Sequence, residues 1–184
     1  MEDDLQESGF KLKLVDEDLT RLQAEIPGVA GSPYEGGRFE LEICVPSDYP
    51  FAAPRARFIK NVWHPNVCSH TGEVGCFGLE DEWRPNITMA TLLVMIQALL
   101  SKPVVLQDLQ DAVVATQYDT NRQLFEETAR FWTQEFAGAC GERNLYMVAK
   151  VDRLCELGAG RVEAITALSR FNWNLKRATN DILG

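Results

Sequence analysis

The sequence predicts an α+β protein in which a four-stranded antiparallel meander packs on helices and a three-helix bundle follows at the C-terminus. Three observations support this fold class. Short runs of alternating apolar and polar residues fill the first third of the chain, as in half-buried strands. Apolar residues at helical spacing dominate the remainder, and a polar break near residues 138–146 isolates the C-terminal stretch. A length of 184 residues fits one medium domain with a small module.

The strands are predicted from period-two alternation. In the clearest run, the odd-numbered positions from Phe39 to Val45 are apolar, and Glu40 and Glu42 lie between them. The four runs are residues 10–14, 22–26, 39–45 and 55–60. Short loops rich in proline and glycine, such as GSPYEGG, separate them. Such loops favour pairing of each run with the next as an antiparallel meander.

The helices are predicted from apolar residues three and four positions apart. TMATLLVMIQALLS is apolar nearly all round, which is typical of a helix buried on most sides, and Thr88 is its expected N-cap. A weaker helix is expected around Ala112–Tyr118. The next helix carries its apolar stripe at i, i+4 spacing, on Leu124, Thr128, Trp132 and Phe136.

The domain organisation follows from where these patterns stop. We expect an acidic arm over residues 1–9, a core domain over 10–137, a linker over 138–146 and the bundle over 147–184. In the bundle, Val148, Val151, Leu154 and Cys155 begin the first helix, and further helices are expected over residues 161–169 and 175–183. A bundle of this size is marginally stable by itself.

Composition excludes several classes of function. The net charge is −9 and the isoelectric point about 4.8, so a phosphate backbone would be repelled and no nucleic-acid partner is expected. The most apolar run, Leu92–Leu100, contains Gln97 and is too short to cross a bilayer, so no membrane partner is expected. The acidic N-terminus is no signal peptide. Five cysteines without a secretory signal favour reduced thiols in the cytoplasm or nucleus.

One long loop, residues 61–86, breaks all periodicity. It holds both histidines of the chain, and long ordered loops in small domains are usually functional. Four residues of zinc-ligand type lie in it, His64, Cys68, His70 and Cys76. Their spacing does not form the usual knuckle and no second half-site follows, so we expect no metal and no other cofactor.

Several motifs in this part of the chain form a known series. PYEGGRFELEICVPSDYPF is followed by WHPN, a cysteine and DEWRPNIT. From Lys11 to Phe136 this series resembles the ubiquitin-conjugating enzyme family and so implies the ubiquitin-conjugating fold. The tail, KVDRLCELGAGRVEAITALSRFNWNLKRATNDIL, resembles a UBA ubiquitin-binding bundle. Together the two parts resemble the UBA-tailed, chain-building branch of the family.

The resemblance implies an activity and a set of partners. Members of the family carry ubiquitin as a thioester on a cysteine and pass it to a lysine amine, chemistry that suits a thiolate nucleophile. The implied partners are ubiquitin, the ubiquitin-activating enzyme, and ubiquitin ligases or another conjugating enzyme. The alternative is a catalytically inactive variant that binds ubiquitin or a partner conjugating enzyme and modulates chain synthesis.

The resemblance also assigns roles to single residues. Cys76 is the expected nucleophile, Asn66 the oxyanion donor, and Asp108 the acidic residue of a gating loop. His64 and Pro65 hold the turn, and Asn66 has the alternative role of bracing the loop through backbone hydrogen bonds. The residues expected to contact ubiquitin in the bundle are Leu157, Gly158 and Leu183.

Two departures from the family pattern bear on these roles. When Gly72 and Trp83 are matched to the family frame, Gly75 falls at the nucleophile position and Cys76 is one place late. A bulge at Gly75 would turn the thiol toward the cleft, whereas without it Cys76 would be a small buried residue. In the bundle, Ala159 stands where the family has an aromatic residue, which predicts weaker contact with ubiquitin.

Overall fold

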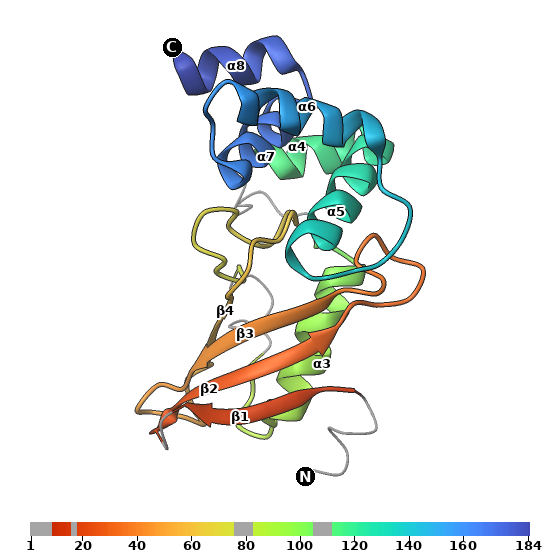
Figure 1. Ribbon diagram of the computed structural model, residues 1–184. Helices are drawn as coiled ribbons and strands as arrows, with labels where there is room; N and C mark the ends of the chain where they lie inside the picture. Colours follow the sequence, from red (N-terminus) through yellow and green to blue (C-terminus); the bar gives the residue numbers. More distant parts are fainter. Residues whose placement is uncertain (1–8, 16–17, 76–82, 105–111) are drawn as a thin grey trace.

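A four-stranded antiparallel sheet forms one layer of the structure, which is a computed structural model that describes residues 9–15, 18–75, 83–104 and 112–184. The strand order is β1-β2-β3-β4, a simple meander (Figure 1). The strands are β1 (Lys11–Val15), β2 (Asp18–Pro27), β3 (Arg38–Cys44) and β4 (Arg55–Phe58). The α+β class and the meander predicted from the alternation are therefore confirmed.

The register of the strands separates an apolar face from a charged one. Ala24 pairs with Leu41 and Ile26 with Phe39, and all four side chains are buried. β2 begins at Asp18, earlier than the alternation indicates, because backbone pairing with β1 continues to Asp18 although positions 18–21 are exposed.

The outer face of the sheet is charged, with cations arranged around each carboxylate. Glu42 lies between Arg21 and Arg57, with N–O distances of 2.5 and 2.6 Å. Glu25 in turn accepts from Lys11 at 2.9 Å and from Arg38 at 3.3 Å. Such half-exposed pairs contribute little stability, but they keep this face of the sheet in water.

Helix α3 (Met89–Ser101) covers the apolar face of the sheet (Figure 1). It begins as predicted, since the Thr88 hydroxyl accepts from the Thr91 N–H at 3.2 Å. Its buried side chains are Leu92, Leu93, Ile96 and Leu100. Gln97, the polar residue within this run, donates to the Pro27 carbonyl at 2.9 Å. None of the helices in the described ranges is both long and apolar enough to span a membrane.

The remaining helices lie at the end of the molecule away from β1 (Figure 1). They are α4 (Ala112–Thr120), α5 (Arg122–Phe136), α6 (Leu145–Glu156), α7 (Arg161–Arg170) and α8 (Leu175–Leu183). The predicted stripe of α5 faces inward, with Thr128 and Trp132 fully buried. The last three helices form the expected bundle.

The bundle is joined to α5 by a buried seam. The Trp132 indole donates to the Ser169 hydroxyl at 2.8 Å, and the Trp173 indole donates to the Thr128 hydroxyl at 2.9 Å. The Phe131 and Trp173 rings meet edge to face with centroids 5.1 Å apart. Both indole N–H groups are therefore satisfied across the seam. The buried apolar side chains of the core domain and of the bundle form one hydrophobic core.

We expect Trp173→Ala to lower the free energy of unfolding by about 3–5 kcal/mol, because it removes a buried indole and its hydrogen bond together. Urea unfolding followed by circular dichroism measures this loss. Leu145→Ala is the control, since Leu145 is 78% exposed and its truncation should change stability by no more than about 0.5 kcal/mol. Equal effects of the two substitutions would show that the seam does not hold the domains together.

Candidate active-site loop

The loop that begins at Asn61 is anchored at its tryptophan. Trp63 is completely buried. Its carbonyl accepts from the Tyr34 hydroxyl at 2.8 Å, and its indole donates to the Gln117 side chain at 2.9 Å. Its ring also packs against Trp132, with centroids 5.1 Å apart. The His-Pro-Asn turn therefore starts from a fixed point in the core.

His64 holds the turn between two backbone groups. It is completely buried, its Nε2 lies 3.0 Å from the Leu99 carbonyl, and its Nδ1 accepts from the Asn66 N–H at 3.0 Å. These partners require the neutral ring protonated at Nε2. Burial lowers the pKa of His64 from 6.5 to about 3. Because both ring nitrogens are engaged, the ring has no nitrogen left to act as a base.

Asn66 pairs with the backbone of Val104. Its Nδ2 donates to the Val104 carbonyl at 2.7 Å, and its Oδ1 accepts from the Val104 N–H at 3.0 Å. This two-point contact is the bracing arrangement that was the alternative role for Asn66. An amide nitrogen carries two N–H groups, so the pairing occupies one of them and an oxyanion would need the other.

The return of the loop brings Gly75 to the same turn. The Gly75 N–H donates to the Asn66 carbonyl at 2.7 Å, and the Val74 N–H donates to the Ala56 carbonyl at 3.0 Å. Gly72 makes this return possible. It has φ +75°, and a Cβ there would lie 2.2 Å from the Phe58 carbonyl oxygen, so only glycine fits.

The two remaining candidates for catalysis, Cys76 and Asp108, lie outside the described residues. Gly75, the residue directly before Cys76, is hydrogen-bonded to the His-Pro-Asn turn. Val104, the last described residue before Asp108, is paired with Asn66. The structure brings His64, Asn66 and Gly75 together through backbone contacts.

The zinc-type residues of the loop do not converge where the structure describes them. His70 is exposed and its Nδ1 lies 3.4 Å from the Ser69 hydroxyl. Among the described side chains, no three of His, Cys, Asp and Glu gather as metal ligands. Gln117 is the residue that sequence reasoning missed, because a single glutamine in a weakly amphipathic helix gives no periodic signal.

The predicted ubiquitin contacts lie on open surface of the bundle. Leu157 is 40% and Leu183 55% exposed. Gly158, between α6 and α7, has φ +102° and open space where a Cβ would be. The seam with α5 uses other residues of the bundle, so docking of the bundle leaves these apolar side chains uncovered.

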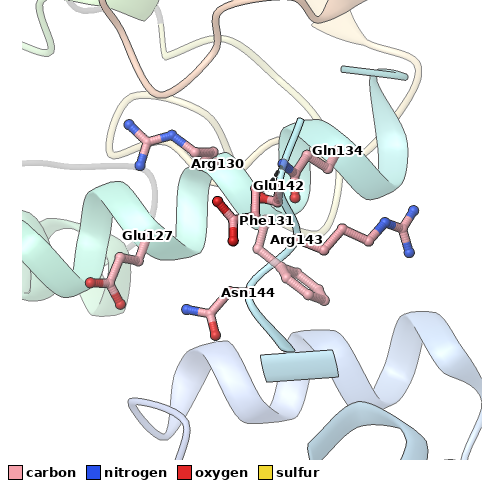
Figure 2. A pocket seen from close by; sticks show the side chains of 7 residues that line it. All are labelled: Glu127, Arg130, Phe131, Gln134, Glu142, Arg143 and Asn144. Carbon is pink, nitrogen blue, oxygen red and sulfur yellow. Dashed lines mark hydrogen bonds between the residues drawn. The ribbon is translucent and has the colours of Figure 1, made fainter. Parts of the chain in front are cut away.

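A hollow of about 270 Å³ between α5 and the linker contains none of these residues. Figure 2 shows its lining, in which Glu127 and Glu142 accompany Arg130 and Arg143. The Gln134 amide donates to the Glu142 carbonyl across it at 3.2 Å. Its lining carries two acidic and two basic side chains.

Comparison with known proteins agrees with this fold. A family model described as ubiquitin-conjugating enzyme matches residues 1–133, and one described as UBA/TS-N domain matches residues 149–180. The chain therefore belongs to the ubiquitin-conjugating enzyme family, whose general chemistry is to carry ubiquitin as a cysteine thioester. Members of the family with a UBA domain interact in general with ubiquitin, activating enzymes and ligases.

Individual relatives are similar over nearly the whole chain. Human ubiquitin-conjugating enzyme E2 K is 44% identical over 176 residues, which cover 95% of this chain and 86% of the relative. Ubiquitin-conjugating enzyme E2 27 of Arabidopsis thaliana is 45% identical over 161 residues, covering 88% and 81%. The solved E2 domain of a Toxoplasma gondii ubiquitin conjugating enzyme is 43% identical with a TM-score of 0.67, covering 73% of this chain and 92% of that one.

We expect the free energy of unfolding to fall as the pH is lowered, because His64 takes up a proton when the chain unfolds. The folded protein holds this ring neutral down to about pH 3, whereas the unfolded chain binds a proton below about pH 6.5. Stability from this residue is therefore present above pH 6.5 and lost as the pH falls toward 3. Between pH 7 and pH 5 the loss is about 2 kcal/mol.

Urea unfolding of the wild type and of His64→Gln at both pH values isolates this contribution. The amide cannot titrate, and the carboxylates titrate alike in both proteins. Between pH 7 and pH 5, the free energy of unfolding of the variant should therefore fall by about 2 kcal/mol less than that of the wild type. Identical pH dependence in the two proteins would rule out the neutral buried ring as the source.

Proposed function

We propose that Cys76 of this chain accepts ubiquitin from the ubiquitin-activating enzyme and transfers it to a lysine. In the first step the thiolate attacks the thioester carbonyl of the charged activating enzyme, a new carbon–sulfur bond forms, and the enzyme's thiolate leaves. In the second step a neutral lysine amine attacks the thioester carbonyl, a carbon–nitrogen bond forms, the carbon–sulfur bond breaks, and the Cys76 thiolate leaves, while the proton lost by the amine passes to a base or to water. The observation that carries the proposal is the bond from the Gly75 N–H to the Asn66 carbonyl.

This bond supports Cys76 because it fixes the chain one residue before the thiol. The remaining N–H of the Asn66 amide is the donor that we assign to the tetrahedral oxyanion. Its other N–H is bonded to Val104, which holds the amide in place before the reaction.

Asp108 is proposed to position or deprotonate the attacking lysine. The described residue nearest to it on its N-terminal side is Val104, whose backbone pairs with Asn66. This pairing ties the last described residue before Asp108 to the candidate site. Removing the carboxylate should affect transfer to lysine and leave charging of Cys76 intact.

The bundle is proposed to bind ubiquitin through the exposed face at Leu157, Gly158 and Leu183. Partly exposed leucines on a stable bundle offer apolar area to a partner. Ala159 supplies less of it than an aromatic residue, so the affinity is expected to be low. We further propose ubiquitin ligases or another conjugating enzyme as partners, and the cytoplasm, the nucleus or both as location.

A catalytically inactive variant is the second candidate. The family frame that puts Gly75 at the nucleophile position favours it, and so does the pairing of Asn66 with Val104, because bracing alone would explain that contact. In that case the chain would bind ubiquitin or a charged conjugating enzyme without forming its own thioester. The two candidates differ in whether a thioester forms on Cys76.

We expect the wild-type chain, incubated with ubiquitin, its activating enzyme and ATP, to form an adduct that thiols remove, and Cys76→Ala to form none. Non-reducing gel electrophoresis measures the adduct. Cys68→Ala is the matched control, since it removes another thiol of the same loop and should leave charging intact. Absence of the adduct with several activating enzymes, or its persistence in Cys76→Ala, would falsify the proposal for this residue.

The same assay tests the proposed role of Asp108. Discharge of the preformed thioester to free lysine should slow by about 10²-fold or more in Asp108→Ala, as for other positioned acid–base groups, while charging is unchanged. A variant that charges and discharges like the wild type would remove Asp108 from the mechanism.

We expect Leu157→Ser and Leu183→Ser each to weaken ubiquitin binding by about tenfold, the loss expected when part of a buried leucine is removed from an interface. Titration of ¹⁵N-ubiquitin with the full chain measures the affinity. Leu145→Ser is the control, since Leu145 is 78% exposed at the other end of α6. Equal weakening by all three, or no shifts at millimolar concentration, would argue against this face.

A further inference from the structure

A line of two hydrogen bonds, both made by the Gln117 side chain, connects the UBA-type bundle to the His-Pro-Asn turn. The bond to Trp63 is buried, and the bond to Asn172, an exposed residue, is partly buried. The Trp63 indole donates to Gln117 Oε1 at 2.9 Å, and Gln117 Nε2 donates to Asn172 Oδ1 at 2.9 Å. Gln117 is only 3% exposed. A single side chain on α4 thus contacts the candidate active-site loop with its oxygen and the bundle with its nitrogen.

The chemistry of the partners fixes the direction of this line. An indole N–H can only donate, so the oxygen of Gln117 must face Trp63. Its NH₂ group must then face Asn172 and needs an acceptor there. No other side chain of similar size supplies both an uncharged acceptor for Trp63 and a donor for Asn172. Glutamate would lose the donor, and methionine or leucine would lose both groups.

The bundle end of the line is held in a conformation that L-residues seldom adopt. Asn172 has φ +51° and Trp173 φ +60°, and a bulky residue in this region is strained. Several contacts impose this backbone. The Trp173 N–H donates to the Leu168 carbonyl at 2.6 Å, its carbonyl accepts from the Lys150 ammonium, and its indole is bonded to Thr128.

The loop end of the line lies one residue before His64. Trp63 has no exposed surface, and the Gln117 contact and the Tyr34 hydroxyl orient its two ends, side chain and carbonyl. A rotated or unpaired indole would shift the start of the turn. Asn66 and Gly75 follow that start, because they are bonded to each other and to His64.

We propose that Gln117 is a positioning residue of the candidate active site, through which the docked bundle holds the His-Pro-Asn turn. Its catalytic consequence rests on the proposed function, whereas its structural consequence does not. Displacing the 172–173 turn removes the acceptor of the Gln117 amide, so the docked arrangement loses a partly buried hydrogen bond and Gln117 is free to rotate away from Trp63. Bundle docking and order of the loop are therefore coupled.

Asn172→Gly tests this coupling without touching the loop. Glycine accepts the positive φ at that position and removes only the acceptor for Gln117. We expect the Trp63 indole N–H resonance to move and its hydrogen exchange to quicken about fivefold, the effect of one neutral hydrogen bond. The Val104 amide, which is bonded to Asn66, should exchange faster as well. ¹⁵N-resolved spectra of the full chain give both readouts and need no ubiquitin.

Two controls make the result specific. Asn172→Asp keeps the acceptor oxygen and should leave the Trp63 indole and the Val104 amide as in the wild type. Arg161→Gln removes the ion pair between bundle and α5, in which Arg161 lies 2.9 Å from Glu135, and it too should leave both signals unchanged. Unchanged signals in Asn172→Gly would overturn the proposal, and so would equal changes in Asn172→Asp, since they would show that the acceptor for Gln117 is not responsible.

An activity readout then separates this proposal from the proposed function. Asn172→Gly should slow discharge of the Cys76 thioester to free lysine several-fold, with Asn172→Asp restoring the wild-type rate and ubiquitin affinity of the bundle unchanged. If no thioester forms in any protein, the proposed function fails while the spectra still decide the coupling. A normal discharge rate together with altered Trp63 signals would refute the positioning role.

Discussion

The buried indole of Trp63 is the contact on which the arrangement of the molecule depends. Gln117 on α4 and Trp132 on α5 contact this indole, and Tyr34, in the loop between β2 and β3, donates to the backbone carbonyl of the same residue. A tryptophan with its N–H satisfied in the core has one allowed orientation. Several elements of the core domain therefore contact Trp63, and this residue fixes the position from which the loop starts.

The loop itself is organised by backbone hydrogen bonds, with side chains in supporting roles. His64 uses both ring nitrogens, and Asn66 its amide oxygen and one amide N–H, to satisfy peptide groups. Buried loops need such partners because an unpaired peptide group is costly. Burial that keeps His64 neutral is part of the same arrangement, since a charged ring could not accept from the Asn66 N–H.

Much of the fold could be predicted because local patterns and tertiary packing agree in it. Alternation located the four strands, Thr88 located the start of α3, and the i, i+4 stripe located α5. The exposed start of β2 could not be predicted, since its pairing depends on β1 rather than on burial. Of the site, the turn at His64 and Asn66 was recognisable from its motif. Gln117 was not, because a glutamine in a helix does not indicate its distant partner. The left-handed pair at Asn172 and Trp173 was not, because these residue types do not by themselves specify that conformation.

The seam between α5 and the bundle changes what a UBA module can do for an enzyme. A module on a flexible tether raises the local concentration of its ligand to a value set by tether length, and presents it in every orientation. Trp132, Ser169, Thr128 and Trp173 remove that freedom here. A ubiquitin held at Leu157 and Leu183 would have a fixed distance and direction from Gly75, so selection among acceptor lysines would depend on geometry rather than on concentration.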